Sequence, residues 1–104
     1  MLTRTYKTLR RENKIMKILC APTFAKQLEV LLGDYTQEDF AAIKSFKMYL
    51  DTIILNMPTK IQKFKKSIYF NDENIKDIEH QGLIIPFYID EKTGDYLILG
   101  IVKK

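Results

Sequence analysis

Four lysines within seven residues form the most concentrated charge of the chain. They lie in the segment TKIQKFKKSIYF, residues 59–70, together with aromatic and aliphatic side chains. A basic patch with an interleaved aromatic residue suits contact with the phosphates and bases of RNA. Lysines are also common on ordinary protein surfaces, so a solvated turn is the alternative interpretation. The candidate nucleic-acid-binding residues are Lys60, Lys63, Lys65 and Lys66.

His80 is the only histidine of the chain, and histidine is the side chain whose unperturbed pKa lies near neutrality. It could therefore transfer protons, or it could be a plain surface residue of the turn before Gly82. The single cysteine, Cys20, cannot form an internal disulfide, and we interpret it as a small buried strand residue. One cysteine and one histidine do not suffice for a metal site. The glycines are too scattered for a phosphate-binding loop, so we expect no cofactor.

The net charge of +4 is concentrated at the N-terminus. Residues 1–15 carry five basic residues against one acidic residue, and they contain all the arginines of the chain. Such a basic arm could contact nucleic acid, but short polar termini are often disordered. We predict a disordered extension over residues 1–15, followed by a single domain over residues 16–104.

A chain of 104 residues, of which 46% are apolar, fits one domain with one modest core. Its apolar runs are far shorter than the roughly 20 residues needed to span a bilayer. No secretory signal pattern is present, and an unpaired cysteine fits a reducing compartment. We therefore expect a cytoplasmic protein without a membrane partner.

Periodicity predicts six elements in the order β-α-α-β-β-β, and hence an α+β fold. Apolar residues at helical spacing follow Pro22 as far as Gly33, and a second apolar stripe runs from Phe40 until Pro58 ends it. Pro86 should mark a sheet edge, a bulge or a place where a strand ladder is interrupted. The strands are predicted at Met16–Ala21, Ile75–Gln81, Leu83–Ile89 and Tyr96–Val102, with Asp90–Asp95 as a hairpin connection.

Three stretches in this order resemble a known family. PTFAKQLEVL is similar to a first helix, LNMP to the end of a second helix, and GLIIPFYIDEKTGDYLILGIVKK to a closing hairpin with a basic end. Over residues 16–104 the chain resembles the RelE/ParE superfamily of bacterial type II toxin–antitoxin toxins. The resemblance implies an antiparallel sheet packed against a two-helix hairpin and a cognate antitoxin as partner. It implies either cleavage of messenger RNA on the ribosome or inhibition of DNA gyrase.

One position departs from the family. The resemblance implies an arginine three residues after the hairpin glycine, where this chain has Ile85. Metal-independent RNA cleavage needs a base, an acid and a cation for the phosphate. The remaining candidates for these catalytic roles are His80, Tyr88, Lys103 and Lys104.

Each of these candidates also has an ordinary structural interpretation. Tyr88 could be a core residue, and the final lysines could simply increase solubility. The missing arginine leaves open an inactive member of the family that serves as a protein-binding module. An unrelated small α+β adaptor is the third possibility.

Overall fold

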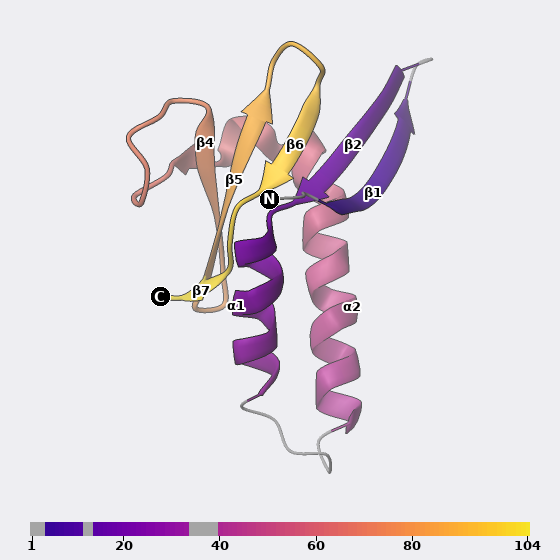
Figure 1. Cartoon of the computed structure of the whole chain (residues 1–104), viewed down its shortest axis with the longest axis vertical. Helices are drawn as coiled ribbons and strands as arrows, with labels where there is room; N and C mark the ends of the chain where they lie inside the picture. Colours follow the sequence, from indigo (N-terminus) through magenta and orange to yellow (C-terminus); the bar gives the residue numbers. More distant parts are fainter. Residues whose placement is uncertain (1–3, 12–13, 34–39) are drawn as a thin grey trace.

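The computed structural model describes residues 4–11, 14–33 and 40–104. Two strands come first, two α-helices and a 3₁₀ helix follow, and five strands complete the chain (Figure 1). The elements are β1 (Arg4–Arg11), β2 (Lys14–Cys20), α1 (Pro22–Leu32), α2 (Phe40–Asn56), η2 (Met57–Lys63), β3 (Lys65–Lys66), β4 (Ile75–His80), β5 (Leu83–Asp90), β6 (Asp95–Ile98) and β7 (Val102–Lys103).

The fold is α+β, with a mixed sheet of seven strands. The strands lie in the order β1-β2-β6-β5-β4-β3, and β7 pairs with β5. The expectation of a wholly antiparallel sheet is wrong for one pair, because β2 and β6 run parallel from Ile18 opposite Tyr96 to Cys20 opposite Ile98. Parallel neighbours need a long crossover connection. Here the helices and the strands β3 to β5 supply it.

Both predicted helices are confirmed. Helix α1 begins at Pro22, where a missing N–H costs nothing, and the N–H of Gly33 donates to the Glu29 carbonyl at its end. Helix α2 gives way to η2 at Met57 and Pro58, because proline cannot continue the helical hydrogen bonds. Figure 1 shows the two helices side by side, with their far ends extending beyond the sheet. No helix in the described ranges is long and apolar enough to cross a membrane.

The hydrophobic core lies between the helices and one face of the sheet. Phe24 of α1 and Ile54 of α2 meet strand residues that are equally inaccessible to solvent. Each such aliphatic or aromatic side chain contributes about 1.5–3 kcal/mol when it is fully buried. The strand residues of this core are Ile18, Cys20, Ile78, Ile85, Phe87 and Ile98, and Ile101 joins them from the segment before β7. We call this side of the sheet the helix face and the other side the open face.

Strand β1 corrects the prediction of a disordered extension for residues 4–11, and the rest of that prediction over residues 1–3, 12 and 13 lies outside the described residues. It pairs antiparallel with β2 from Arg4 to Arg11. The Tyr6 ring meets the Phe24 ring edge-on, with 6.2 Å between centroids, and the Tyr6 hydroxyl donates to the Asp51 carboxylate. Burial and the neighbouring carboxylate raise the pKa of Tyr6. The predicted boundary at Met16 falls inside β2, because contacts with both helices make the first strand part of the sheet.

The C-terminal hairpin is confirmed, and of the three alternatives predicted for Pro86 the structure has the interrupted ladder and not the sheet edge. Strand β5 pairs with β6 up to Phe87 opposite Ile98, and pairing resumes only at Ile84 opposite Val102. Three residues, 99–101, thus face two residues of β5. The predicted last strand is therefore divided into β6 and β7. The Leu99 N–H donates to the Pro86 carbonyl across this irregularity.

Candidate functional site

His80 lies beside a cavity of about 260 Å³ between α2 and β4. Its imidazole Nε2 and the Tyr49 hydroxyl share a hydrogen bond, and their ring centroids are 5.0 Å apart. The polar residues that line the cavity are Tyr49, Thr52, Asn56, Lys60, Glu79 and His80, and the apolar ones are Ile53, Phe64 and Ile78.

Helical spacing explains why the α2 residues meet at this cavity. Tyr49, Thr52 and Asn56 are separated by three and four positions, so they share one side of the helix. His80 is two positions beyond buried Ile78 in β4, so both side chains point to the helix face. The cavity therefore combines an imidazole, a phenol, the Lys60 ammonium and the Glu79 carboxylate, which is itself paired with Lys104. Together these can exchange protons and hold an anion.

Tyr88 is not part of this group. It pairs with Ile75, whereas the core residues Ile78 and Ile85 pair with each other. Directly opposed side chains share a face and successive ones alternate, so Tyr88 lies on the open face and His80 on the helix face. These two sequence-predicted candidates are separated by the sheet itself.

The two C-terminal lysines lie at different sites. Lys104 forms an ion pair with Glu79 and donates a hydrogen bond to its carboxylate. The hydrogen bond lowers the pKa of the Glu79 carboxyl, and Lys65 has a smaller effect in the same direction. Lys103 pairs with Leu83 in the ladder and lines a separate groove against α1. The structure thus brings Lys104 near the His80 strand and places Lys103 elsewhere.

The four candidate nucleic-acid-binding lysines are all solvent-exposed. Lys60 and Lys63 belong to η2, and Lys65 and Lys66 form β3. Lys60 alone lines the Tyr49–His80 cavity, whereas Lys66 donates to the Asn71 side chain. The cluster thus runs from the cavity toward the sheet edge.

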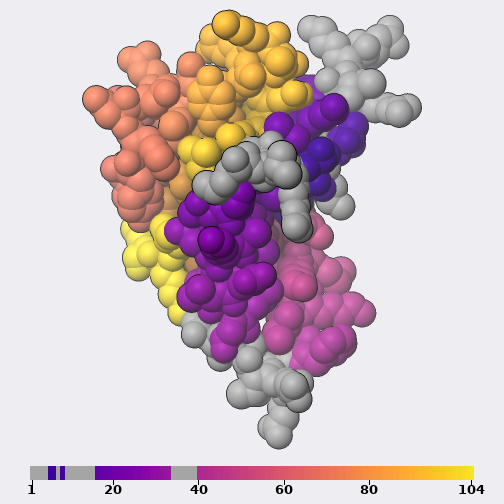
Figure 2. All heavy atoms as spheres, viewed as in Figure 1, coloured from indigo at the N-terminus to yellow at the C-terminus, as the bar shows by residue number. Residues whose placement is uncertain are grey.

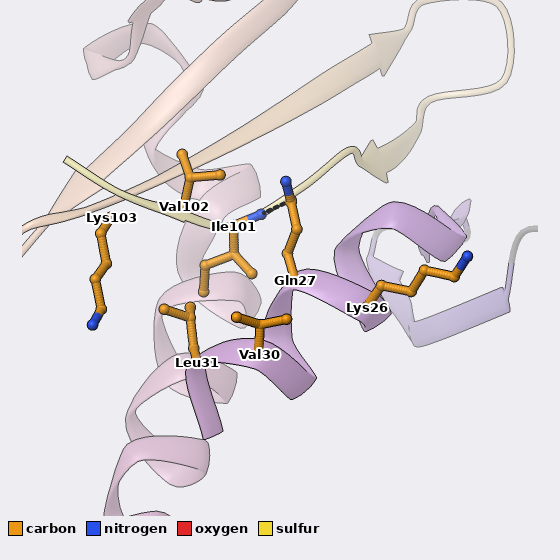
Figure 3. Close-up of a pocket in the computed structure, with 7 residues that line it drawn as sticks. All are labelled: Lys26, Gln27, Val30, Leu31, Ile101, Val102 and Lys103. Carbon is orange, nitrogen blue, oxygen red and sulfur yellow. Dashed lines mark hydrogen bonds between the residues drawn. The ribbon is translucent and has the colours of Figure 1, made fainter. Parts of the chain in front are cut away.

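A second hollow lies between α1 and the C-terminal segment. We call it the α1–β7 groove; its volume is about 370 Å³. Figure 3 shows Val30 and Leu31 facing Ile101, with Lys26 and Lys103 on opposite sides. The Gln27 side-chain oxygen accepts a hydrogen bond of 2.9 Å from the Ile101 N–H.

Sequence reasoning did not identify Tyr49 or Gln27. Tyr49 stands outside the apolar stripe that predicted α2, and Gln27 is a single polar residue within α1. Tyr49 could have been identified as an aromatic residue that lies outside the apolar stripe of an amphipathic helix. Cys20 is buried in β2 as expected. Among the described residues, no cluster of three histidine, cysteine or acidic side chains could hold a metal ion.

Comparison with models of known protein families gives no match. Comparison with curated proteins gives no match either.

Proposed function

We propose that this chain is the toxin component of a type II toxin–antitoxin pair, with a RelE/ParE-like fold. One observation carries the proposal: a helical hairpin packs on the sheet face formed by β2, β4, β5 and β6, and a basic strand ends the chain. The two helices on one face of the sheet are what the resemblance of the three sequence stretches implies, whereas the parallel β2–β6 pair departs from the antiparallel sheet that it implies. The extra strands β1 and β3 extend the sheet at its two edges.

The proposed activity is metal-independent cleavage of RNA at the Tyr49–His80 cavity. His80 takes the proton of a ribose 2′-hydroxyl, whose oxygen attacks the adjacent phosphorus. The bond to the 5′-oxygen breaks, and the Tyr49 phenol donates a proton to this leaving group. Lys60 balances the negative charge of the phosphorane. Acid and base groups of this kind contribute about 10²–10⁴-fold each to a rate.

A specific observation favours a second candidate, a member that acts only by binding, either to gyrase or as an inactive protein-binding module. Ile85, which stands where the family has an arginine, is 1% exposed in the core. Its side chain is closed off between the helices and the sheet. Tyr88 is on the other face, and Lys104 is held by Glu79. Tyr88 and Lys104 therefore do not contribute to the Tyr49–His80 cavity. Fewer candidate acids, bases and cations remain there for RNA cleavage.

Growth of a bacterial culture during induction of the full chain tests the proposal, together with mapping of messenger RNA ends. We expect arrest with new RNA ends. His80→Gln and Tyr49→Phe should relieve both, whereas Tyr69→Phe, which changes another exposed tyrosine, should relieve neither. Circular dichroism of each variant checks folding.

Other results separate the two candidates. Arrest with intact RNA, unaffected by His80→Gln, would favour inhibition by binding. Absence of arrest from soluble, folded protein would contradict an active toxin in that host.

A further inference from the structure

We propose that the α1–β7 groove binds an acidic amphipathic segment of a partner protein. The inference rests on the proposed function to the extent that this partner is the antitoxin. The groove is separate from the Tyr49–His80 cavity, because the two share no lining residue. It is defined by Val30, Leu31, Ile101 and Val102, with Lys26, Gln27 and Lys103 around them.

The groove is lined mainly by apolar side chains, and Ile101 at its base is 1% exposed. Val30 is 71% exposed although it lies on the helix that also carries core residue Phe24. A single exposed valine needs no explanation. Here, however, Leu31 and Ile101 face it across a hollow (Figure 3). Apolar grooves of this kind accept the apolar face of an amphipathic segment.

The apolar surface continues beyond the groove. A neighbouring hollow of about 220 Å³ shares Gln27 and Val102 with it. Pro86 and Leu99 line this second hollow, and the aromatic rings of Tyr69 and Phe70 border it. In Figure 2 the C-terminal segment lies directly beside α1 at the surface. Because the two hollows share lining residues, they adjoin one another, which fits a segment of chain that could occupy both better than a compact ligand in one.

The charges around this surface have one sign. Of the described residues that line the two hollows, those with a charge are Lys26 and Lys103, and no carboxylate is among them. Lysines on opposite sides of an apolar floor complement a segment whose apolar side chains are flanked by Asp or Glu. Such complementarity selects partners and excludes those of the wrong charge. A basic segment would meet two like charges.

Contacts within the chain itself hold one wall of the groove in place. The hydrogen bond from the Ile101 N–H to Gln27 fixes the C-terminal segment against α1. Gly100 permits this contact, since a Cβ at this position would collide with the Gln27 side-chain oxygen. A preformed groove avoids the cost of ordering the binding surface.

Two model peptides test the inference with the full chain. Each has about 18 residues, enough for a helix, and an identical leucine stripe at helical spacing. One carries Glu beside the stripe and the other Lys. We expect the Glu peptide to shift the backbone amide NMR signals of Val30, Leu31, Ile101 and Val102. We expect the Lys peptide to bind at least about tenfold more weakly, a difference of about 1.4 kcal/mol.

Matched variants make the test specific. Val30→Glu should weaken binding of the Glu peptide by at least about tenfold, whereas Met48→Glu, which changes an exposed residue of α2, should not. The double variant Lys26→Glu, Lys103→Glu should reverse the preference between the peptides. Dispersed amide spectra confirm that each variant is folded.

Several outcomes would overturn the inference: shifts outside the groove, no binding of either peptide, or equal binding of both. A concentration-dependent dimer in sedimentation that Val30→Glu abolishes would identify a second copy as the occupant instead. The growth assay is independent of these results. Arrest without peptide binding contradicts this inference alone, and peptide binding without arrest contradicts the active toxin alone.

Discussion

The Tyr6 hydroxyl donates a hydrogen bond to the Asp51 carboxylate and so joins strand β1 to helix α2 across 45 positions of the chain. The same tyrosine meets Phe24 of α1 edge-on. One residue of the first strand therefore contacts both helices. These contacts explain why a segment that the sequence predicts to be a disordered basic extension is part of the sheet.

Removal of this hydroxyl should destabilise the fold. We expect Tyr6→Phe to lower the free energy of unfolding by about 1–3 kcal/mol, since it leaves a partly buried carboxylate without its donor. Urea denaturation measures the change. Tyr69→Phe is the matched control, because Tyr69 is about half exposed, and it should change stability by less than about 0.5 kcal/mol. Equal effects of the two substitutions would contradict the role of the Tyr6–Asp51 bond.

The same bond predicts a dependence on alkaline pH. Burial, followed by the Asp51 hydrogen bond, raises the pKa of Tyr6 above its ordinary value of 10.0. Above that pH the unfolded chain loses the phenolic proton while the folded chain keeps it, so stability falls as pH rises. The contribution is fully present below about pH 10. Unfolding free energies from about pH 8 to about pH 11 should show the advantage of the natural chain over Tyr6→Phe shrinking above about pH 10. A difference independent of pH would argue against this linkage.

The ion pair between Glu79 and Lys104 should be visible in a titration. The Lys104 hydrogen bond lowers the pKa of Glu79, so Lys104→Ala should raise this pKa toward its ordinary value. Carboxyl NMR shifts followed through acid pH measure it. A lowered carboxyl pKa supports stability above the unfolded value, and this support is lost as pH falls through the folded value. Because the pair is exposed, we expect little change in stability itself. Lys92→Ala, remote in sequence, should leave the Glu79 titration unchanged.

Introduction of an arginine at position 85, where the RelE/ParE resemblance implies one, should unfold the domain. Ile85 is 1% exposed and belongs to the core, so Ile85→Arg would bury an unpaired charge. We expect a loss above about 4 kcal/mol, measured by thermal denaturation. Ile85→Leu should cost less than about 1.5 kcal/mol. A stable Ile85→Arg protein would contradict the burial of this position and would mean that the helix face opens there.

Gly100 and Gln27 should behave as a coupled pair. Gly100→Ala would displace the Gln27 side chain that accepts the Ile101 N–H, at a cost of about 1 kcal/mol. In a Gln27→Ala background the obstacle is absent, so the added methyl should cost less. A double-mutant cycle measured by urea denaturation gives the coupling, expected at about 0.5 kcal/mol or more. Strict additivity would show that the two residues act independently.

The sequence by itself determined the elements that depend on local patterns. Apolar spacing and two prolines predicted the ranges of α1 and α2, and Pro86 predicted the interruption between β6 and β7. Such signals act within a few residues, because helical spacing and the missing proline N–H need no distant partner. They also indicated an α+β fold and a short strand before Gly82.

The tertiary structure alone decided which residues meet. His80 and Tyr88 were candidates for one site, but strand register places them on opposite faces of the sheet, and His80 meets Tyr49 of α2 instead. A shift of one residue in register would move every strand side chain to the other face. The parallel β2–β6 pair and the placement of β1 likewise depend on contacts between residues far apart in the chain. No local pattern encodes such contacts, because they arise only when the helices and the sheet pack together to bury a common core.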